Sequence, residues 1–133
     1  FSIPIAVRYA DLDPQWHVNN ARFNSFIEQA RYQYMIHLGL WEGGDFWKLG
    51  AIVADVHIVY LVPIELSDPV RVDVRVASIG NKSFTFEYQI VNPENGVLFA
   101  RAETAMVAYD YSTKQSIRVP DDWRAKIAAF EGI

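Results

Sequence analysis

Carboxylates, an imidazole and amides are concentrated in one short stretch near the start of the sequence. The ten residues from Asp11 to Asn20 read Asp-Leu-Asp-Pro-Gln-Trp-His-Val-Asn-Asn and follow an extended apolar segment, Ile3 to Ala10. They end where apolar residues begin to recur at helical spacing. At a helix N-terminus the backbone N–H groups lack partners and the dipole is positive. Such a place can hold a carbonyl oxygen as it becomes negative, while a nearby carboxylate attacks the carbonyl carbon or activates water.

The predicted helix that follows is the only long one in the chain. Its apolar positions recur every three or four residues from Ala21 onward, which is the spacing of a helix face that packs on a core. They are Phe23, Phe26, Ile27, Ala30, Tyr34 and Leu38. This helix is therefore the element that must cover the apolar side of any sheet.

The rest of the chain is almost wholly strand. The predicted strands are Ala51 to Ile64, Val70 to Ile79, Phe84 to Ile90 and Val97 to Tyr111, and Pro120 opens a short helix to about Phe130. Valines alternate with charged residues in the second of these strands, so one face is core and the other solvated. We expect an α+β fold in which a five-stranded antiparallel sheet, including the first extended segment, wraps around the long helix. Its free strand edges favour self-association.

Length and composition narrow the class of protein. With 133 residues the chain fits one domain over residues 1–133. It has no cysteine, which excludes thiolate nucleophiles, disulfides and zinc held by cysteine. A net charge of -4 argues against a nucleic-acid surface. No apolar run approaches the roughly 18 residues of a membrane span. No signal segment is present, so a cytoplasmic location is expected, although the sequence begins at Phe1 without a Met.

Several motifs resemble the hot-dog-fold acyl-CoA thioesterases of the 4-hydroxybenzoyl-CoA thioesterase type. The first motifs are Val-Arg-Tyr-Ala-Asp-Leu-Asp over residues 7–13, His-Val-Asn-Asn over 17–20, Phe23, and Glu-Gln-Ala-Arg over 28–31. Residues 60–64, the strand after Asp68-Pro69, and residues 76–83 are also similar to later strands of that family. The resemblance spans roughly residues 3 to 111. It implies a hot-dog fold, hydrolysis of an acyl-CoA thioester to a free acid and coenzyme A, and a homodimer or homotetramer with the site between subunits.

The resemblance also assigns site residues. Asp13 matches the catalytic carboxylate of the family, acting as nucleophile through a mixed anhydride or as general base on water. Asn20 matches the position whose backbone N–H polarises the thioester carbonyl. His17 and Asn19 match residues that line the substrate pocket. The link from residue 14 to 16 departs from the small, often Gly-containing link of relatives, and Trp16 is expected to narrow the acyl site.

A second branch of hot-dog enzymes carries the carboxylate on the central helix, and Glu28 is the matching alternative here. An ion pair with Arg31, three residues later, is the competing role for Glu28. For Asp11 we expect a capping role, since short carboxylates accept hydrogen bonds from free N–H groups.

For the coenzyme A phosphates the sequence offers Lys82 beside Ser83, and Arg101. No metal or other cofactor is called for, because one carboxylate and one oxyanion donor suffice for a thioester. The nearest alternatives are a thioesterase acting on acyl carrier protein, a dehydratase relative, and a non-catalytic acyl-CoA-binding or regulatory domain. The aromatic residues fit an aryl slot, an aliphatic tunnel, core packing or a dimer contact.

Overall fold

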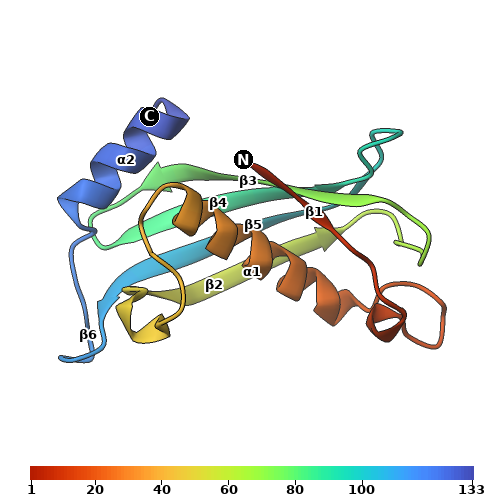
Figure 1. The fold of residues 1–133 in the computed structure, drawn as a ribbon, viewed down its shortest axis with the longest axis horizontal. Helices are drawn as coiled ribbons and strands as arrows, with labels where there is room; N and C mark the ends of the chain where they lie inside the picture. Colours follow the sequence, from red (N-terminus) through yellow and green to blue (C-terminus); the bar gives the residue numbers. More distant parts are fainter.

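The computed structural model describes residues 1–133 and has a single six-stranded sheet with two α-helices. The strands are β1 (Ser2–Ile5), β2 (Ala51–Tyr60), β3 (Val70–Ile79), β4 (Ser83–Val91), β5 (Leu98–Asp110) and β6 (Gln115–Ser116); the helices are α1 (Asn20–His37) and α2 (Asp121–Glu131), with 3-10 turns η1 (Tyr9–Asp11) and η2 (Phe46–Lys48). The sheet is antiparallel in the order β1-β3-β4-β5-β2, and β6 pairs with the end of β5. The predicted α+β architecture is confirmed: α1 lies across one face of the sheet, and α2 lies at the end away from the loop that precedes α1 (Figure 1).

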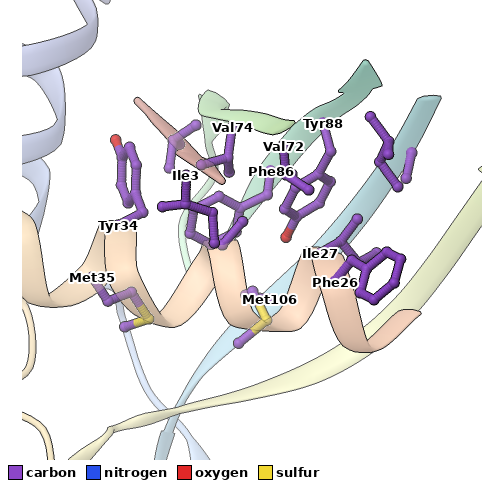
Figure 2. Close-up of a cluster of buried hydrophobic side chains, with 14 of the residues drawn as sticks. Ile3, Phe26, Ile27, Tyr34, Met35, Val72, Val74, Phe86, Tyr88 and Met106 are labelled. Carbon is purple, nitrogen blue, oxygen red and sulfur yellow. The ribbon is translucent and has the colours of Figure 1, made fainter. Parts of the chain in front are cut away.

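The core lies between α1 and the inner face of the sheet. Alternate residues of β3 and β4 point inward, as their sequence alternation predicts, and Val72, Phe86 and Ile90 have no exposed surface. Residues from α1, including Ile27 and Tyr34, are also completely buried (Figure 2). Burial of side chains of this size stabilises the fold by roughly 1.5–3 kcal/mol each, before entropy is counted. This core fixes the direction of α1 relative to the strands.

The inner face of β2 is less well covered than the rest of the sheet. The α1 helix packs against β3 and β1 rather than β2. As a result Val53, Val56 and Tyr60 of β2 keep 44%, 39% and 47% of their surface exposed. Since β2 hydrogen-bonds only to β5, its other edge is free. One side of the molecule therefore combines an unpaired strand edge with uncovered apolar side chains.

The structure corrects several predicted boundaries. β1 ends at Ile5, and the chain then forms the η1 turn in place of an extended segment to Ala10. β2 ends at Tyr60 rather than Ile64, because the Leu61 and Val62 N–H groups both turn to the Phe99 carbonyl at 2.8 and 3.1 Å. The two-residue strand β6 was not predicted. Both of its residues are exposed, so they carry no apolar signal.

Candidate active site

Asp13 begins a tight turn that projects from the start of α1. Its N–H donates to the His17 carbonyl at 3.0 Å, and its own carbonyl accepts from the Trp16 N–H at 3.0 Å. One carboxylate oxygen, Oδ1, accepts from the Gln15 N–H at 2.9 Å, and no hydrogen bond engages the other oxygen. The side chain is half-buried. Asp13 thus combines a fixed backbone with a carboxylate oxygen that has no partner.

The turn is joined directly to the N-terminus of α1. Leu12 and Val18 pair as an antiparallel bridge, and the Asn19 N–H donates to the Asp11 carbonyl at 2.8 Å. Asn19 is the N-cap, since its Oδ1 accepts from the Ala21 N–H at 2.9 Å. The Asn20 N–H, the first of the helix, makes none of the cap, turn or loop hydrogen bonds. A backbone donor is therefore left free two residues beyond the bridge that positions Asp13.

Asp11 is buried and structural, but its side chain caps the η1 turn rather than the start of α1. Its side chain accepts from the Arg8 N–H at 2.8 Å and from the Arg8 guanidinium at 3.0 Å, and Arg22 lies 3.7 Å away. Burial acts to raise the pKa of Asp11, but the hydrogen bonds from Arg8 and the charges of both arginines outweigh it and hold the pKa below its usual range. The carboxylate is fully engaged and is not free to attack a substrate.

His17 lies on the far side of the turn from Asp13 and is half-buried. It pairs with Glu65 as an isolated antiparallel bridge. Together with Pro63, Asn92 and Phe99 it lines a cleft of about 320 Å³ at the same end of the sheet. A backbone hydrogen bond holds His17 next to Asp13, whereas Asp13, Asn19 and Asn20 do not line this cleft.

Trp16 does not point into a pocket of its own chain. It is 65% exposed, adopts a left-handed backbone with φ of 62°, and meets Tyr9 edge-on at 6.2 Å between ring centroids. Tyr9 is itself 71% exposed. The expectation that Trp16 narrows the acyl site is therefore not met within one chain, because the positive φ turns the indole outward onto Tyr9.

Glu28 does not have the partner that the sequence predicts for it. The expected ion pair with Arg31 is wrong, because no Glu28 oxygen lies within 4.0 Å of a cationic nitrogen. Arg31 turns inward instead, is only 3% exposed, and donates to the Tyr88 hydroxyl at 3.2 Å. Burial, aided by the negative charge of Glu28, raises the pKa of Tyr32. Glu28 is thus half-buried beside Tyr32 without a cationic partner.

Lys82, Ser83 and Arg101 are not brought to the Asp13 loop within one chain. Ser83 pairs with Val107 near the end of β5, whereas the Asp13 loop lies near the start of β5. Lys82 Nζ contacts the Ser116 carbonyl at 3.5 Å, and Arg101 is exposed. These three candidates lie at the far end of the sheet or on its outer face.

Tyr60 lies beside the candidate site, and sequence reasoning missed it. Its hydroxyl donates to the Asn20 carbonyl at 3.0 Å, and its ring meets Phe23 edge-on at 5.0 Å. It thereby ties the end of β2 to the start of α1. Its alternating position at the end of β2 was the sequence signal available. The sequence could not show the contact itself, because Tyr60 and Asn20 are 40 residues apart.

No group of three or more metal-ligating side chains occurs in the structure. Neither helix is both long and apolar enough to cross a membrane. What the site offers is therefore a carboxylate and a free backbone donor at a helix start.

Comparisons with known proteins bear on this site. Residues 7–127 match the model of a family described as the thioesterase-like superfamily. The long-chain acyl-CoA thioesterase FadM of Escherichia coli strain K12 is 27% identical over 123 residues, which are 92% of this chain and 93% of that protein. The acyl-CoA thioesterase YbgC of Haemophilus influenzae is 25% identical over 127 residues, covering 94% and 92%. The crystal structure of a Thermus thermophilus thioesterase complexed with coenzyme A and zinc superposes with a TM-score of 0.87 at 32% identity, covering 99% of this chain and 94% of that chain.

Proposed function

Because the chain belongs to the thioesterase-like superfamily, we propose that it hydrolyses an acyl-CoA thioester to a free acid and coenzyme A. The family confirms the resemblance stated from the sequence, and with it the hot-dog fold and the class of thioester hydrolase. Two relatives named as acyl-CoA thioesterases, FadM and YbgC, support coenzyme A as the thiol part of the substrate. We retain the cytoplasm as the proposed location.

In the proposed mechanism the thioester carbonyl oxygen accepts a hydrogen bond from the Asn20 N–H. The positive end of the α1 dipole adds to the stabilisation as this oxygen becomes negative. Removal of one preorganised oxyanion donor costs on the order of 100-fold or more in rate in enzymes of this general type. Here the donor belongs to the main chain, so the side chain of Asn20 is free to vary.

The Asp13 carboxylate supplies the attacking group by one of two routes. As general base it takes a proton from water, whose oxygen then bonds to the carbonyl carbon. As nucleophile its own oxygen bonds to that carbon and forms a mixed anhydride, which water then hydrolyses. In both routes the carbon–sulfur bond breaks and the thiolate leaves with the electron pair. The net reaction consumes one water and yields one acid and one thiol.

The observation that carries this proposal is the pair of unsatisfied groups at the start of α1. Asp13 keeps one carboxylate oxygen without a hydrogen bond, and the Asn20 N–H has no acceptor, while backbone hydrogen bonds from Asp13, Trp16, Val18 and Asn19 hold the turn between them. Water can satisfy both groups, since Asn20 is exposed and Asp13 is half-buried, and a substrate can displace that water. His17 and Asn19, beside the same turn, would line the pocket. Asp13 is favoured over Glu28 because the motifs over residues 7–13 and 17–20 resemble the branch of the family that uses the loop carboxylate.

We propose that the working enzyme is a homodimer or homotetramer with its site between subunits. The free edge of β2 and the exposed apolar residues beside it support a pairing of β2 with its own copy. An antiparallel pairing brings the Lys82–Ser83 turn of one protomer to the same end of the assembly as the Asp13 loop of the other. That arrangement would place Lys82 and Ser83 on the coenzyme A side of the site.

The test is an assay of the purified protein with a panel of acyl-CoA thioesters of aryl and aliphatic type, together with an acyl carrier protein thioester. A thiol reagent reads the released thiol without background, since the chain has no cysteine. We expect thiol release from at least one acyl-CoA. Release only from the carrier protein thioester would identify that substrate instead. Acyl-CoA binding without any thiol release would favour a non-catalytic binding domain.

A further inference from the structure

In a single chain, the β2 edge of the sheet has unpaired backbone groups and exposed apolar side chains. Residues on the inner faces of β3 and β4 are covered by α1, whereas Val53, Val56 and Tyr60 of β2 remain 39–47% exposed. The edge of this ten-residue strand has unpaired N–H and C=O groups. Long, apolar, unpaired edges are uncommon on isolated proteins, because they pair with other strands. Another strand is the occupant that satisfies both the edge and the uncovered face.

The charges of β2 suit a second copy of the same chain. Asp55 and His57 lie on the outer face, on either side of Val56 in sequence. A two-fold axis near Val56 places Asp55 of each protomer beside His57 of the other. An axis at Asp55 would instead set two aspartates face to face, which is unfavourable in a strand pair. The pattern therefore favours an antiparallel pairing centred near Val56.

This pairing has a geometric consequence for the active site. In an antiparallel pair the start of one β2 lies beside the end of the other. The end of β2 is Tyr60, whose hydroxyl bonds to the Asn20 carbonyl at the start of α1. The start of β2 follows directly on η2. The η2 turn of one protomer is thus carried toward the α1 N-terminus of its partner.

The η2 turn holds an aromatic side chain on the inner side of the sheet. Phe46 packs against Tyr32 of α1 at 5.7 Å and against Trp41 at 5.0 Å between ring centroids, yet it remains 56% exposed. A two-fold axis perpendicular to the sheet keeps the inner faces of both protomers on the same side. The exposed side of Phe46 then faces the uncovered apolar residues of the partner's inner β2 face, which end at Tyr60 beside the start of α1.

We infer that Phe46 of one protomer forms an apolar wall of the acyl site of the other, supported by Tyr32 and Trp41 of its own chain. The inference rests on the proposed thioesterase function. An aromatic wall there would contact an apolar chain or ring attached to the thioester carbonyl and exclude water from it. Phe46 would then set which acyl groups are accepted, while taking no part in bond breaking.

A mixed-dimer experiment tests which chain Phe46 serves. Asp13→Asn and Phe46→Ala variants are given different affinity tags, co-expressed, and purified as the heterodimer through both tags. One of its two sites then combines an intact Asp13 with an intact Phe46 from the other protomer. We expect the heterodimer to show about half the wild-type kcat/KM per dimer on the best acyl-CoA. This value is well above half the kcat/KM of the Phe46→Ala homodimer. Phe46→Leu, which keeps an apolar side chain, should be impaired less than Phe46→Ala.

Two results overturn the inference. A heterodimer with only half the activity of the Phe46→Ala homodimer would mean that Phe46 serves its own chain. An undiminished Phe46→Ala homodimer would mean that Phe46 lines no acyl site. Phe46 is more than half exposed, so the variants are expected to fold, and circular dichroism and gel filtration check this.

A cross-linking experiment gives the geometry without using activity, and so separates this inference from the proposed function. Phe46→Cys is combined with Asn24→Cys, an exposed position one turn beyond Asn20, and a short bis-maleimide is added. We expect a covalent dimer on a denaturing gel. The matched control joins Phe46→Cys with Gln33→Cys, which is exposed on the opposite side of α1, and the two single variants are run beside it. Equal cross-linking in the control pair would contradict the proposed arrangement, even in a fully active enzyme.

Discussion

The two ends of the sheet differ in whether their polar groups have hydrogen-bond partners. At the α2 end, Glu131 Oε1 accepts from the Tyr34 hydroxyl at 2.6 Å and from the Val76 N–H at 3.1 Å. Burial and the Glu131 carboxylate raise the pKa of Tyr34, so it stays a hydrogen-bond donor. At the Asp13 end, a carboxylate oxygen and a helix N–H have no partners. The difference suggests that the α2 end serves stability and the Asp13 end keeps its groups available for a ligand.

The largest effect that tests this comparison is loss of turnover at the Asp13 end. Asp13→Asn removes the charged oxygen, and we expect kcat to fall by roughly 100- to 10,000-fold, the range attributed to a positioned general base. The unfolding midpoint and oligomer size should be unchanged, because the half-buried side chain makes only one local hydrogen bond.

Glu28→Gln is the matched control, since it removes the same charge from the alternative position on α1. It should keep kcat near the wild-type value. If Asp13→Asn is active while Glu28→Gln is dead, the catalytic carboxylate lies on α1 and the loop is structural.

The second effect is loss of stability at the α2 end. Glu131→Ala leaves the Tyr34 hydroxyl and the Val76 N–H without an acceptor, and we expect the free energy of unfolding to fall by about 1–3 kcal/mol. Urea denaturation measures this loss, and kcat of the folded protein should be unchanged. Glu131→Gln keeps an acceptor and should lose less. A kcat that falls with the stability would mean that the two ends are coupled.

A third, smaller effect concerns Asp11, the structural carboxylate beside the site. Its pKa is lowered in the folded protein, so it stabilises the fold above the ordinary aspartate pKa of about 3.9, and this contribution is lost as the pH falls toward the folded pKa. Asp11→Asn should therefore cost about 1–3 kcal/mol at pH 7 and progressively less as the pH falls below about 3.9, by urea denaturation. An equal cost at both pH values would assign the loss to packing rather than charge.

The smallest effect concerns the backbone of the turn. Trp16 has a φ of 62°, a conformation that asparagine adopts more readily than tryptophan. Because the indole is mostly exposed, Trp16→Asn should raise the free energy of unfolding by about 0.5 kcal/mol. Trp16→Phe retains the strain and should give no gain. A loss of stability in Trp16→Asn would show that the Tyr9 contact outweighs the strain.

Regular alternation made much of the fold predictable from the sequence. The bounds of β3 were predicted without error, and β4, β5 and α1 within one or two residues, because apolar residues recur there at the period of the element. β1 was predicted too long. The η1 turn that ends it depends on hydrogen bonds between Arg8 and Asp11, which an apolar pattern does not report.

The arrangement of the candidate residues was predictable where they are close in sequence. Asp13, His17, Asn19 and Asn20 fall within one loop and the first turn of one helix, so the structure brings them together. Long-range contacts were missed. Arg31 was paired with Glu28 by helical spacing, but its guanidinium reaches Tyr88, 57 residues away. Only the packing of α1 on the sheet decides between these two partners.

The free edge of β2 also bears on how the protein behaves on dilution. A site that draws residues from two chains exists only while the chains are associated, so its abundance follows mass action. Activity per milligram should then hold steady in concentrated solution and fall once the protomer concentration drops below the dissociation constant. The total activity in a cell would then rise more steeply than in proportion to the amount of protein expressed.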